Sequence, residues 1–291
     1  MNLWITAFVY GLSMSGVLFL VSVGISIGFG LMRIVNMEQM VYYTFGAYMA
    51  YTIVTATGSF FLGIVAAITV AAALGVIVET QLLRRVYERE MMFTMVVTFS
   101  VFLIGIGIIQ YIWGLDPKPI ASPMETMIQV ARVKVPLYRL LIFGAAILIY
   151  AGIQLLLNRT IMGKAIRAGI ENPNNVKGLG INIYKIFTIM FVIASGIAGL
   201  GGALYAPLIM VGPYMGWDML LFAFITVILG GLGSIKGTMV SALILGQVMA
   251  LGGTLWAPLA FIAPFMVMFL VILVKPTGLF GVRGVAFGFQ S

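Results

Sequence analysis

The sequence contains no cysteine and no histidine, and only 8 of its 291 residues are acidic. These absences exclude disulfides, zinc sites of the usual kinds, haem ligation by histidine and histidine-based catalytic triads. The string Gly-x-x-x-x-Gly-Lys-Ser/Thr, which cradles nucleotide phosphates in P-loop ATPases, does not occur either. We therefore expect no cofactor, no metal and no nucleotide site of this type.

Charged side chains are scarce and apolar ones are abundant. Only 8% of the residues are charged, against roughly 25% in soluble domains, and 62% are hydrophobic. The apolar runs reach the length of about 20 residues that a helix needs to cross a hydrocarbon core. They lack the period-2 alternation of a membrane β-barrel. The sequence therefore predicts an all-α polytopic membrane protein.

The apolar runs predict eight or nine transmembrane helices. They fall at about residues 4–32, 41–57, 61–83, 91–113, 137–157, 186–210, 219–230, 238–255 and 259–274. No basic residue precedes the first run and no small-residue cleavage site is evident, so we expect this helix to be retained rather than removed as a signal peptide. Because nothing between the runs resembles a soluble domain, residues 1–291 are expected to form a single membrane domain.

The net charge of +8 comes from basic residues between apolar runs, and such residues concentrate in cytoplasmic loops. Three basic clusters are therefore predicted to be cytoplasmic. They are Arg84, Arg85 and Arg89, then the loop 158–185, then Lys275 and Arg283. Residues 114–138 would then face outward, although they contain basic side chains of their own. Their four prolines exclude a long helix and favour an ordered external loop.

The first apolar run ends in a polar stretch that contains Arg33, Asn36, Glu38 and Gln39. One interpretation is a tight cytoplasmic turn in which these side chains are solvated. The other is a break inside the membrane, where polar residues line a cavity and irregular backbone is shielded from lipid. A charge at the bilayer centre costs about 2.5–3.5 kcal/mol on insertion scales, so an intramembrane Glu38 needs Arg33, water or a ligand beside it. Spacing alone leaves both open.

A second interruption is the glycine-rich stretch 230–237, which includes Gly230, Gly231 and Gly233 and follows a short apolar run. A short run before such a break is typical of a discontinuous helix near a transport pathway. A helix–helix turn with left-handed glycines explains it equally well. In the sixth run, small residues spaced four apart between 195 and 203 predict close helix packing.

The loop 158–185 carries five of the 16 basic residues. Residues 162–170 can form a short helix, and Asn172 before Pro173 predicts the start of a second one that ends near Gly180. Two short helices around a turn would make a rigid cytoplasmic knob on which a separate ATPase could dock. The alternative is a solvated loop on anionic headgroups, held by Arg159, Lys164, Arg167 and Lys177.

Several motifs together resemble the permeases of branched-chain amino acid ABC importers, a family that includes urea and short-amide permeases. They are Arg-Ile-Val-Asn at 33–36, Gly-Ala-Tyr at 46–48, Met-Gly-Lys-Ala-Ile-Arg-Ala at 162–168, Leu-Gly-Ile-Asn at 179–182, Leu-Gly-Gly-Leu-Gly-Ser-Ile at 229–235 and Lys-Pro-Thr-Gly-Leu-Phe-Gly at 275–281. The resemblance covers nearly the whole chain. It implies a multi-pass subunit of a bacterial-type inner membrane that pairs with a second homologous permease, two cytoplasmic ATP-binding subunits and an external substrate-binding protein.

The resemblance also implies roles for individual residues. Loop 158–185 becomes the coupling segment, with Arg167, Ala168, Glu171, Asn172, Pro173, Lys177 and Gly180 at the ATPase. Asn36, Glu38, Gln39, Gly230, Gly231 and Gly233 become the translocation pathway, which favours interrupted helices near Asn36 and Gly231. The family commonly reads Asn-Phe-Ala-His-Gly where this chain reads Asn-Met-Glu-Gln-Met at 36–40. Because Gln39 cannot become cationic as a histidine can, the cargo stays open.

The leading hypothesis is a non-enzymatic permease subunit that carries a branched-chain amino acid or a related small polar solute and is powered by partner ATPases. The alternative is a secondary transporter or channel driven by an ion gradient, with Glu38 as the titrating group. An intramembrane enzyme is the weakest hypothesis, because Glu38, Glu79 and Asp218 are scattered with no motif around them.

Overall fold

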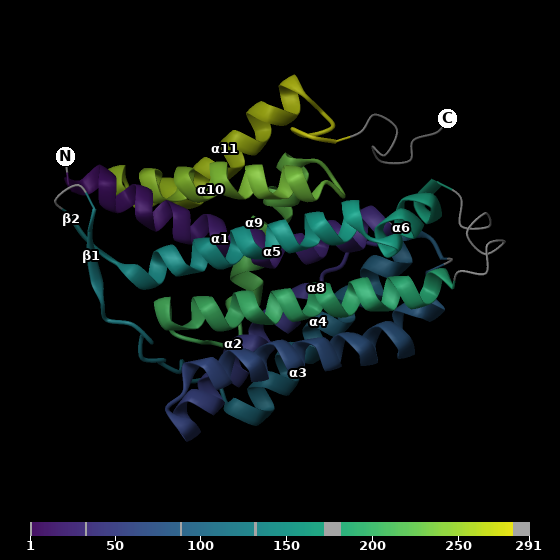
Figure 1. Cartoon of the computed structure of the whole chain (residues 1–291), viewed down its shortest axis with the longest axis horizontal. Coiled ribbons are helices and arrows are strands. Elements are labelled where there is room, and N and C mark those ends of the chain that lie inside the picture. Colours follow the sequence, from purple (N-terminus) through teal and green to yellow (C-terminus); the bar gives the residue numbers. More distant parts are fainter. Residues whose placement is uncertain (1, 33, 88, 131–132, 172–181, 282–291) are drawn as a thin grey trace.

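The computed structural model describes residues 2–32, 34–87, 89–130, 133–171 and 182–281, and Figure 1 shows them as a bundle of helices. The α-helices are α1 (Asn2–Met32), α2 (Gln39–Thr57), α3 (Phe60–Gln81), α4 (Met91–Trp113), α5 (Leu137–Arg159), α6 (Ile161–Glu171), α8 (Ile183–Tyr205), α9 (Met215–Gly230), α10 (Ile235–Leu255) and α11 (Leu259–Val274). Short 3-10 turns follow α3 (Leu83–Arg85) and α8 (Ala206–Leu208). Strands β1 (Met127–Val130) and β2 (Val133–Pro136) form one hairpin.

The predicted fold class is confirmed: the chain is an all-α polytopic membrane protein. Within the described residues, six helices are long and apolar enough to cross a membrane, namely α1, α3, α4, α5, α8 and α10. Helices α9 and α11 are shorter apolar helices of 16 residues each. Together with α2, they account for the three remaining apolar runs of the sequence.

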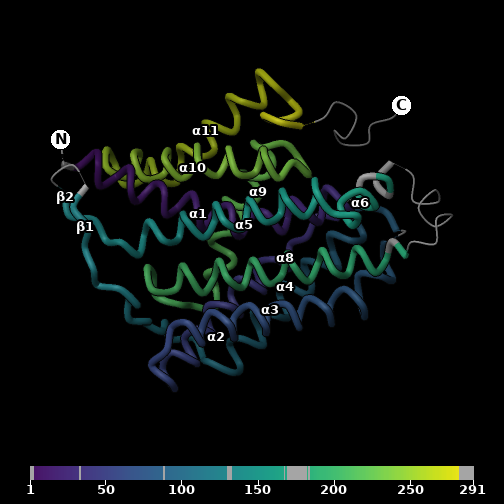
Figure 2. The backbone as a smooth tube through the Cα atoms, viewed as in Figure 1, coloured from purple at the N-terminus to yellow at the C-terminus, as the bar shows by residue number. Residues whose placement is uncertain are grey.

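Helix α1 forms the centre of the bundle and is the most buried of the six long apolar helices. It packs against α5, α8, α9 and α10, and Figure 2 shows it running between α10 and α5. Its contacts with α10 are antiparallel, because Ser15 Oγ donates to the Leu243 carbonyl at 3.3 Å while Gly30 lies against Gly233 near the other end. Glycines allow this approach, since a side chain at Gly30 would meet the backbone of Gly233.

The small residues of α8 pack against two other helices, as the sequence predicts. A side chain at Gly202 would collide with the Tyr43 carbonyl of α2, and one at Gly199 would collide with Ala67 and Ala71 of α3. Such close backbone approach gains dispersion contacts in a lipid environment that offers no hydrophobic drive for helix association. Helices α2, α3 and α8 therefore form one tightly packed layer.

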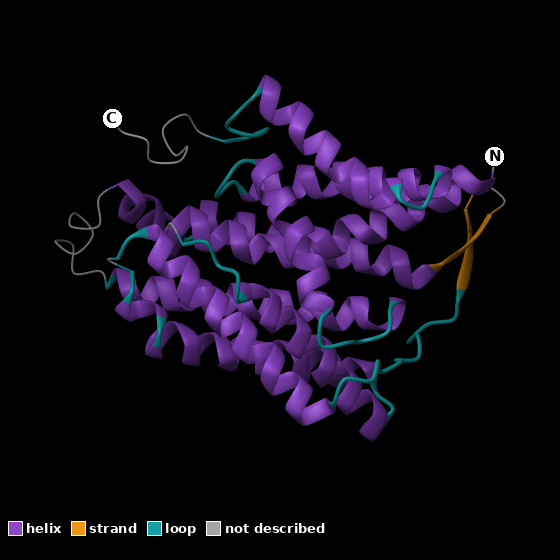
Figure 3. Ribbon diagram, turned by 180° about the vertical axis from the view of Figure 1, so that it is seen from behind, coloured by secondary structure: helices purple, strands orange, loops and turns teal. Residues whose placement is uncertain are grey.

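Residues 114–138, which the charge pattern predicts to be external, contain the hairpin of β1 and β2, which the sequence analysis did not predict (Figure 3). The prolines do exclude a long helix there, but the alternating β-branched residues of β2 also form a strand. Val133 and Val135 pack on Val9 of α1. The hairpin therefore closes the end of the bundle at which α1 begins, and we call this the hairpin end.

The opposite end, which we call the α6 end, carries those members of the three basic clusters that lie within the described residues. Arg84 reaches across to Thr188 near the start of α8, at 2.7 Å. Lys275 Nζ donates to the Leu279 carbonyl, and Leu279 pairs in turn with Leu229 beside the glycine-rich turn. Helix α6 lies at the end of the bundle opposite the hairpin (Figure 1). This arrangement agrees with the prediction that the basic clusters share one side of the membrane.

Candidate functional site

The polar break between α1 and α2 lies inside the bundle. After α1 ends at Met32, the Ile34 N–H donates back to the Gly28 carbonyl at 3.4 Å, and the chain folds back along α1. Asn36 then lies beside Gly28, and the Gln39 side chain lies beside Gly24. Gly24 lies eight residues before Met32, the last residue of α1. Because an α-helix rises by about 1.5 Å per residue, α2 begins beside a point of α1 that is about 12 Å from its end. The polar break therefore lies among the helices rather than in a turn at the bundle's end, although α1 itself is continuous from Asn2 to Met32 and is not an interrupted helix.

Asn36 and Gln39 are fully buried and bonded to each other and to α8. The Gln39 N–H donates to Asn36 Oδ1 at 3.0 Å, so the Asn36 side chain satisfies the backbone donor of the first residue of α2. The Gln39 Nε2 group donates to the Ala194 carbonyl of α8 at 2.7 Å. In this conformation the Gln39 side chain fastens α2 to α8, and Asn36 holds Gln39 in place. Their predicted role in lining a pathway stays a prediction, and it requires these bonds to open.

Glu38 has free hydrogen-bonding capacity. It is 0% exposed, and neither carboxylate oxygen has a hydrogen-bond partner among the described residues. Arg33, which the sequence analysis named as its potential partner, lies outside the described residues. A buried polar group without a partner is costly, so this position invites water, a proton or a ligand.

A second buried carboxylate, Glu79 in α3, was not predicted as a site residue. Arg84 contacts one of its oxygens at 3.2 Å, and the Tyr87 hydroxyl donates to the other at 2.9 Å. Arg84 also donates to Thr188 of α8. This network joins α3 to α8 at the α6 end, and only the tertiary structure brings Thr188 to it.

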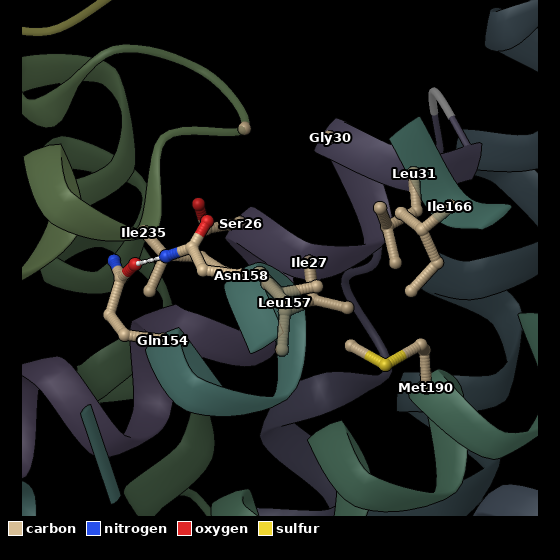
Figure 4. Close-up of a pocket in the computed structure, with 11 residues that line it drawn as sticks. Ser26, Ile27, Gly30, Leu31, Gln154, Leu157, Asn158, Ile166, Met190 and Ile235 are labelled. Atoms are coloured by element: carbon tan, nitrogen blue, oxygen red, sulfur yellow. Dashed lines mark hydrogen bonds between the residues drawn. The ribbon is translucent and has the colours of Figure 1, made fainter. Parts of the chain in front are cut away.

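A cavity of about 220 Å³ lies at the α6 end, between α1, α5, α6, α8 and the start of α10 (Figure 4). Its wall is mostly apolar, with Ser26, Gln154 and Asn158 as its polar side chains. The Ser26 hydroxyl is buried and finds no partner within the described parts of the chain, whereas Asn158 Nδ2 donates to Gln154 Oε1 at 2.8 Å. We call this the inner cavity. The sequence analysis missed these polar residues, because an isolated serine or glutamine within an apolar run gives no signal of where it faces.

The glycine-rich stretch is a tight turn between α9 and α10. Gly231 and Gly233 have left-handed φ angles of 99° and 80°, which favour glycine. Ser234 caps α10 by accepting from the Gly237 N–H at 3.0 Å. The turn therefore has the geometry of the helix–helix alternative. Gly233 also lines the inner cavity, whereas Gly230 and Gly231 are not part of its wall.

The predicted helix at residues 162–170 is confirmed as α6. Ala165 and Ile166 are buried against the bundle, whereas Lys164 and Ala168 are exposed. Helix α6 contacts α1, α5 and α8, and Ile166 lines the inner cavity. Arg167 and Glu171 belong to the same helix. The other predicted coupling residues, Asn172, Pro173, Lys177 and Gly180, and the second predicted helix lie outside the described residues.

Comparison with known proteins gives a consistent result along the chain. Residues 7–274 match the family described as "Branched-chain amino acid transport system / permease component". The chain is 25% identical to the high-affinity branched-chain amino acid transport system permease protein LivH of Escherichia coli (strain K12), covering 93% of both chains. It is 26% identical to the corresponding protein BraD of Pseudomonas aeruginosa, covering 94% of both.

A shorter match is 36% identical over 101 residues, which is 34% of this chain and 29% of its relative. That relative is the probable branched-chain amino acid transport permease protein LivM of Methanocaldococcus jannaschii. No solved structure matches the chain. Because the family match covers most of the sequence, the chain belongs to the permease component family of branched-chain amino acid transport systems.

Proposed function

We propose that this chain is the membrane-spanning permease of an ABC importer in the cell inner membrane. Its cargo is a branched-chain amino acid or a related small polar solute, and separate subunits hydrolyse the ATP. The family match over residues 7–274 supports the transport role. The missing P-loop string supports an external energy source. The chain itself performs no covalent chemistry in this proposal.

The observation that carries this proposal is the position of α6. This helix packs across the ends of α1, α5 and α8, and its Ile166 side chain forms part of the inner cavity wall. A force on the exposed side of α6 would therefore reach the cavity directly. An ATPase that closes around nucleotide can apply such a force, and the interface would then couple hydrolysis to the conformation of the bundle.

The proposed complex contains a second homologous permease, two cytoplasmic ATP-binding subunits and an external substrate-binding protein. The partial match to a LivM protein, a permease with a different name, supports two related permeases in one complex. Co-purification of the tagged chain, followed by identification of its partners, tests the composition. Recovery of an ATPase and a sister permease supports the proposal, and purification of this chain alone under mild conditions contradicts it.

The coupling role is tested by Arg167→Ala and Glu171→Ala on α6, in vesicles that contain the complete complex. We expect uptake of L-leucine, L-isoleucine or L-valine to fall at least tenfold while the protein remains in the membrane. The matched control is Lys134→Ala, which removes an exposed cation at the hairpin end. Uptake that is unchanged in both α6 variants, or equally reduced in the control, would count against the coupling role.

One observation keeps the ion-driven alternative open for testing. Both carboxylate oxygens of Glu38 are buried without hydrogen-bond partners among the described residues, as a titrating transport residue could be. Vesicles that lack the ATPase but carry a proton gradient separate the two mechanisms. Uptake that persists there and is lost in Glu38→Gln would favour the alternative, whereas no uptake without the ATPase favours the importer.

A further inference from the structure

A cluster of four side chains at the α6 end holds the start of α8 against α3. Glu79 lies near the C-terminus of α3, Arg84 and Tyr87 lie between α3 and α4, and Thr188 lies in the second turn of α8. We call these four residues the polar anchor. None of them lines the inner cavity, so the anchor is a separate feature of this end. Helices α3 and α8 pack on each other, and the anchor closes their contact at the α6 end (Figure 2).

Arg84 makes the connection between the two helices. Its Nη2 group lies 3.2 Å from Glu79 Oε2 and also donates to Thr188 Oγ1 at 2.7 Å. The guanidinium group is planar and rigid, so it holds two partners in a fixed relative position better than a lysine does. A shift of the start of α8 would therefore pull on the end of α3 through this one side chain.

Glu79 keeps Arg84 in this position. The Glu79 side chain is 0% exposed, and its second oxygen, Oε1, accepts from the Tyr87 hydroxyl at 2.9 Å. A buried carboxylate is costly unless it is paired and hydrogen-bonded, so Glu79 resists separation from both partners. Apolar residues of similar volume often stabilise a fold as well as a buried ion pair does. Stability alone therefore gives no reason for a carboxylate here, whereas the fixing of Arg84 does.

Tyr87 attaches the segment between α3 and α4 to α8 a second time. Its ring is stacked on Tyr184, with the centroids 6.5 Å apart and 3° between the planes, and it meets Phe187 edge-on at 5.9 Å. Both arrangements are favourable for aromatic pairs. Tyr184 is the second residue of α8 and belongs to the loop 158–185, which is predicted to be the coupling segment. The aromatic contacts therefore reach the last part of that segment.

The predicted coupling segment is thus attached to the bundle near both of its ends. In its first part, α6 packs on α1, α5 and α8, and in its last part the start of α8 is joined to α3. We propose that the polar anchor transmits movement of the coupling segment to α3, with Arg84 and Tyr87 as positioning residues. Hydrogen-bond networks and packed side chains between rigid helices carry coupling of this kind. This inference rests on the proposed function and adds a second route, separate from α6 and the inner cavity.

Thr188→Val tests the bridge while leaving the Glu79–Arg84 pair in place. The matched control is Thr80→Val in α3. Each hydroxyl donates to the carbonyl four residues earlier in its own helix, but only Thr188 also accepts from Arg84. In vesicles with the complete complex, we expect the number of L-leucine molecules taken up per ATP hydrolysed to fall at least about fivefold in Thr188→Val and to change little in Thr80→Val. Equal ratios in the two variants would overturn the proposal.

Two further variants separate coupling from stability, which thermal unfolding of the complex measures. Arg84→Met leaves the buried Glu79 carboxylate with Tyr87 alone, so this variant should unfold at a lower temperature. Adding Glu79→Gln removes the buried charge and should restore most of the lost stability, although the double variant still lacks a bridge to Thr188. We expect uptake per ATP to remain several-fold below that of the wild type. Recovery of uptake per ATP together with stability would show a purely structural anchor and overturn the proposal.

Hydrogen exchange tests the transmission without any transported solute. Backbone exchange of residues 82–87 is measured by mass spectrometry in the complete complex, first without nucleotide and then after trapping with ATP and vanadate. Because exchange reports local opening, we expect trapping to change the exchange rate of this segment at least about twofold in the wild type and in Thr80→Val, but not in Thr188→Val. No change in the wild type, or the same change in all three proteins, would overturn the proposal.

The same measurements distinguish the polar anchor from the transport proposal. If the wild-type complex couples L-leucine uptake to ATP hydrolysis and Thr188→Val does so equally well, the role of the anchor is rejected and the transport function stands. If the wild-type complex hydrolyses ATP but takes up no branched-chain amino acid, the proposed cargo is rejected. Hydrogen exchange of residues 82–87 in Thr188→Val and Thr80→Val then decides the role of the anchor.

Discussion

Replacement of Asn36 by leucine tests whether the polar break is a structural joint. In the folded chain, Asn36 Oδ1 accepts the Gln39 N–H at 3.0 Å, and both residues are buried. Leucine removes the acceptor and leaves that N–H without a partner, away from water. An unsatisfied buried donor costs about 1–3 kcal/mol. The equilibrium constant for unfolding should therefore rise about 5- to 150-fold.

Serine is the matched replacement, because its hydroxyl can also accept from the backbone of the first helical turn. We expect Asn36→Ser to retain most of the stability that Asn36→Leu loses. Unfolding is measured by titrating the purified protein with SDS in mixed micelles and following helix content. If both variants unfold within about 0.5 kcal/mol of the wild type, the bond from the Gln39 N–H to Asn36 contributes no more than an ordinary surface substitution, and the reasoning is refuted.

The same two variants also bear on the predicted pathway role of Asn36. Uptake is compared after normalising for the amount of folded protein in the membrane. A loss of uptake in Asn36→Leu beyond the loss of folded protein would support a role in the pathway. Preserved expression together with preserved uptake would eliminate that role and leave Asn36 as a structural residue alone.

Two further predictions concern glycines that look alike in the sequence. Gly202→Ala should destabilise the fold by about 1–3 kcal/mol, because the new methyl group meets the Tyr43 carbonyl. Gly107→Ala, on the open surface of α4, should leave the stability unchanged or raise it. Titration with SDS compares the stability of the two variants. Gly233→Ala should lower the free energy of unfolding more than Gly58→Ala does. Both glycines have positive φ angles, but only Gly233 also touches a neighbouring helix. Equal losses of stability would show that the contact with α1 is unimportant.

Some elements of the fold follow from local sequence because their causes are local. The apolar runs predict the helices of the bundle, and the small residues of the sixth run predict that α8 packs closely on other helices, without showing that these are α2 and α3. Residues 162–170 predict α6. The β1–β2 hairpin was missed, because the prolines around it indicate only what the segment cannot be. Its strands are fixed by packing on Val9, which lies more than a hundred residues earlier.

The candidate sites were less predictable than the fold. The sequence does identify the polar stretch at Asn36 and the glycine-rich turn at Gly233, since charge and glycine are conspicuous in an apolar chain. It does not reveal that Gln39 bonds to Ala194, because that contact depends on the register of α2 against α8.

By itself, the sequence determined that this protein spans the membrane as helices and carries no P-loop, and its motifs indicated the permease family. Those properties depend on composition and short patterns, which act through solvation and local backbone preference. The tertiary structure decided how deep the polar break lies, which glycines permit helix contact, and which side chains line the inner cavity. These depend on the relative placement of distant helices, which close packing fixes and no local pattern encodes.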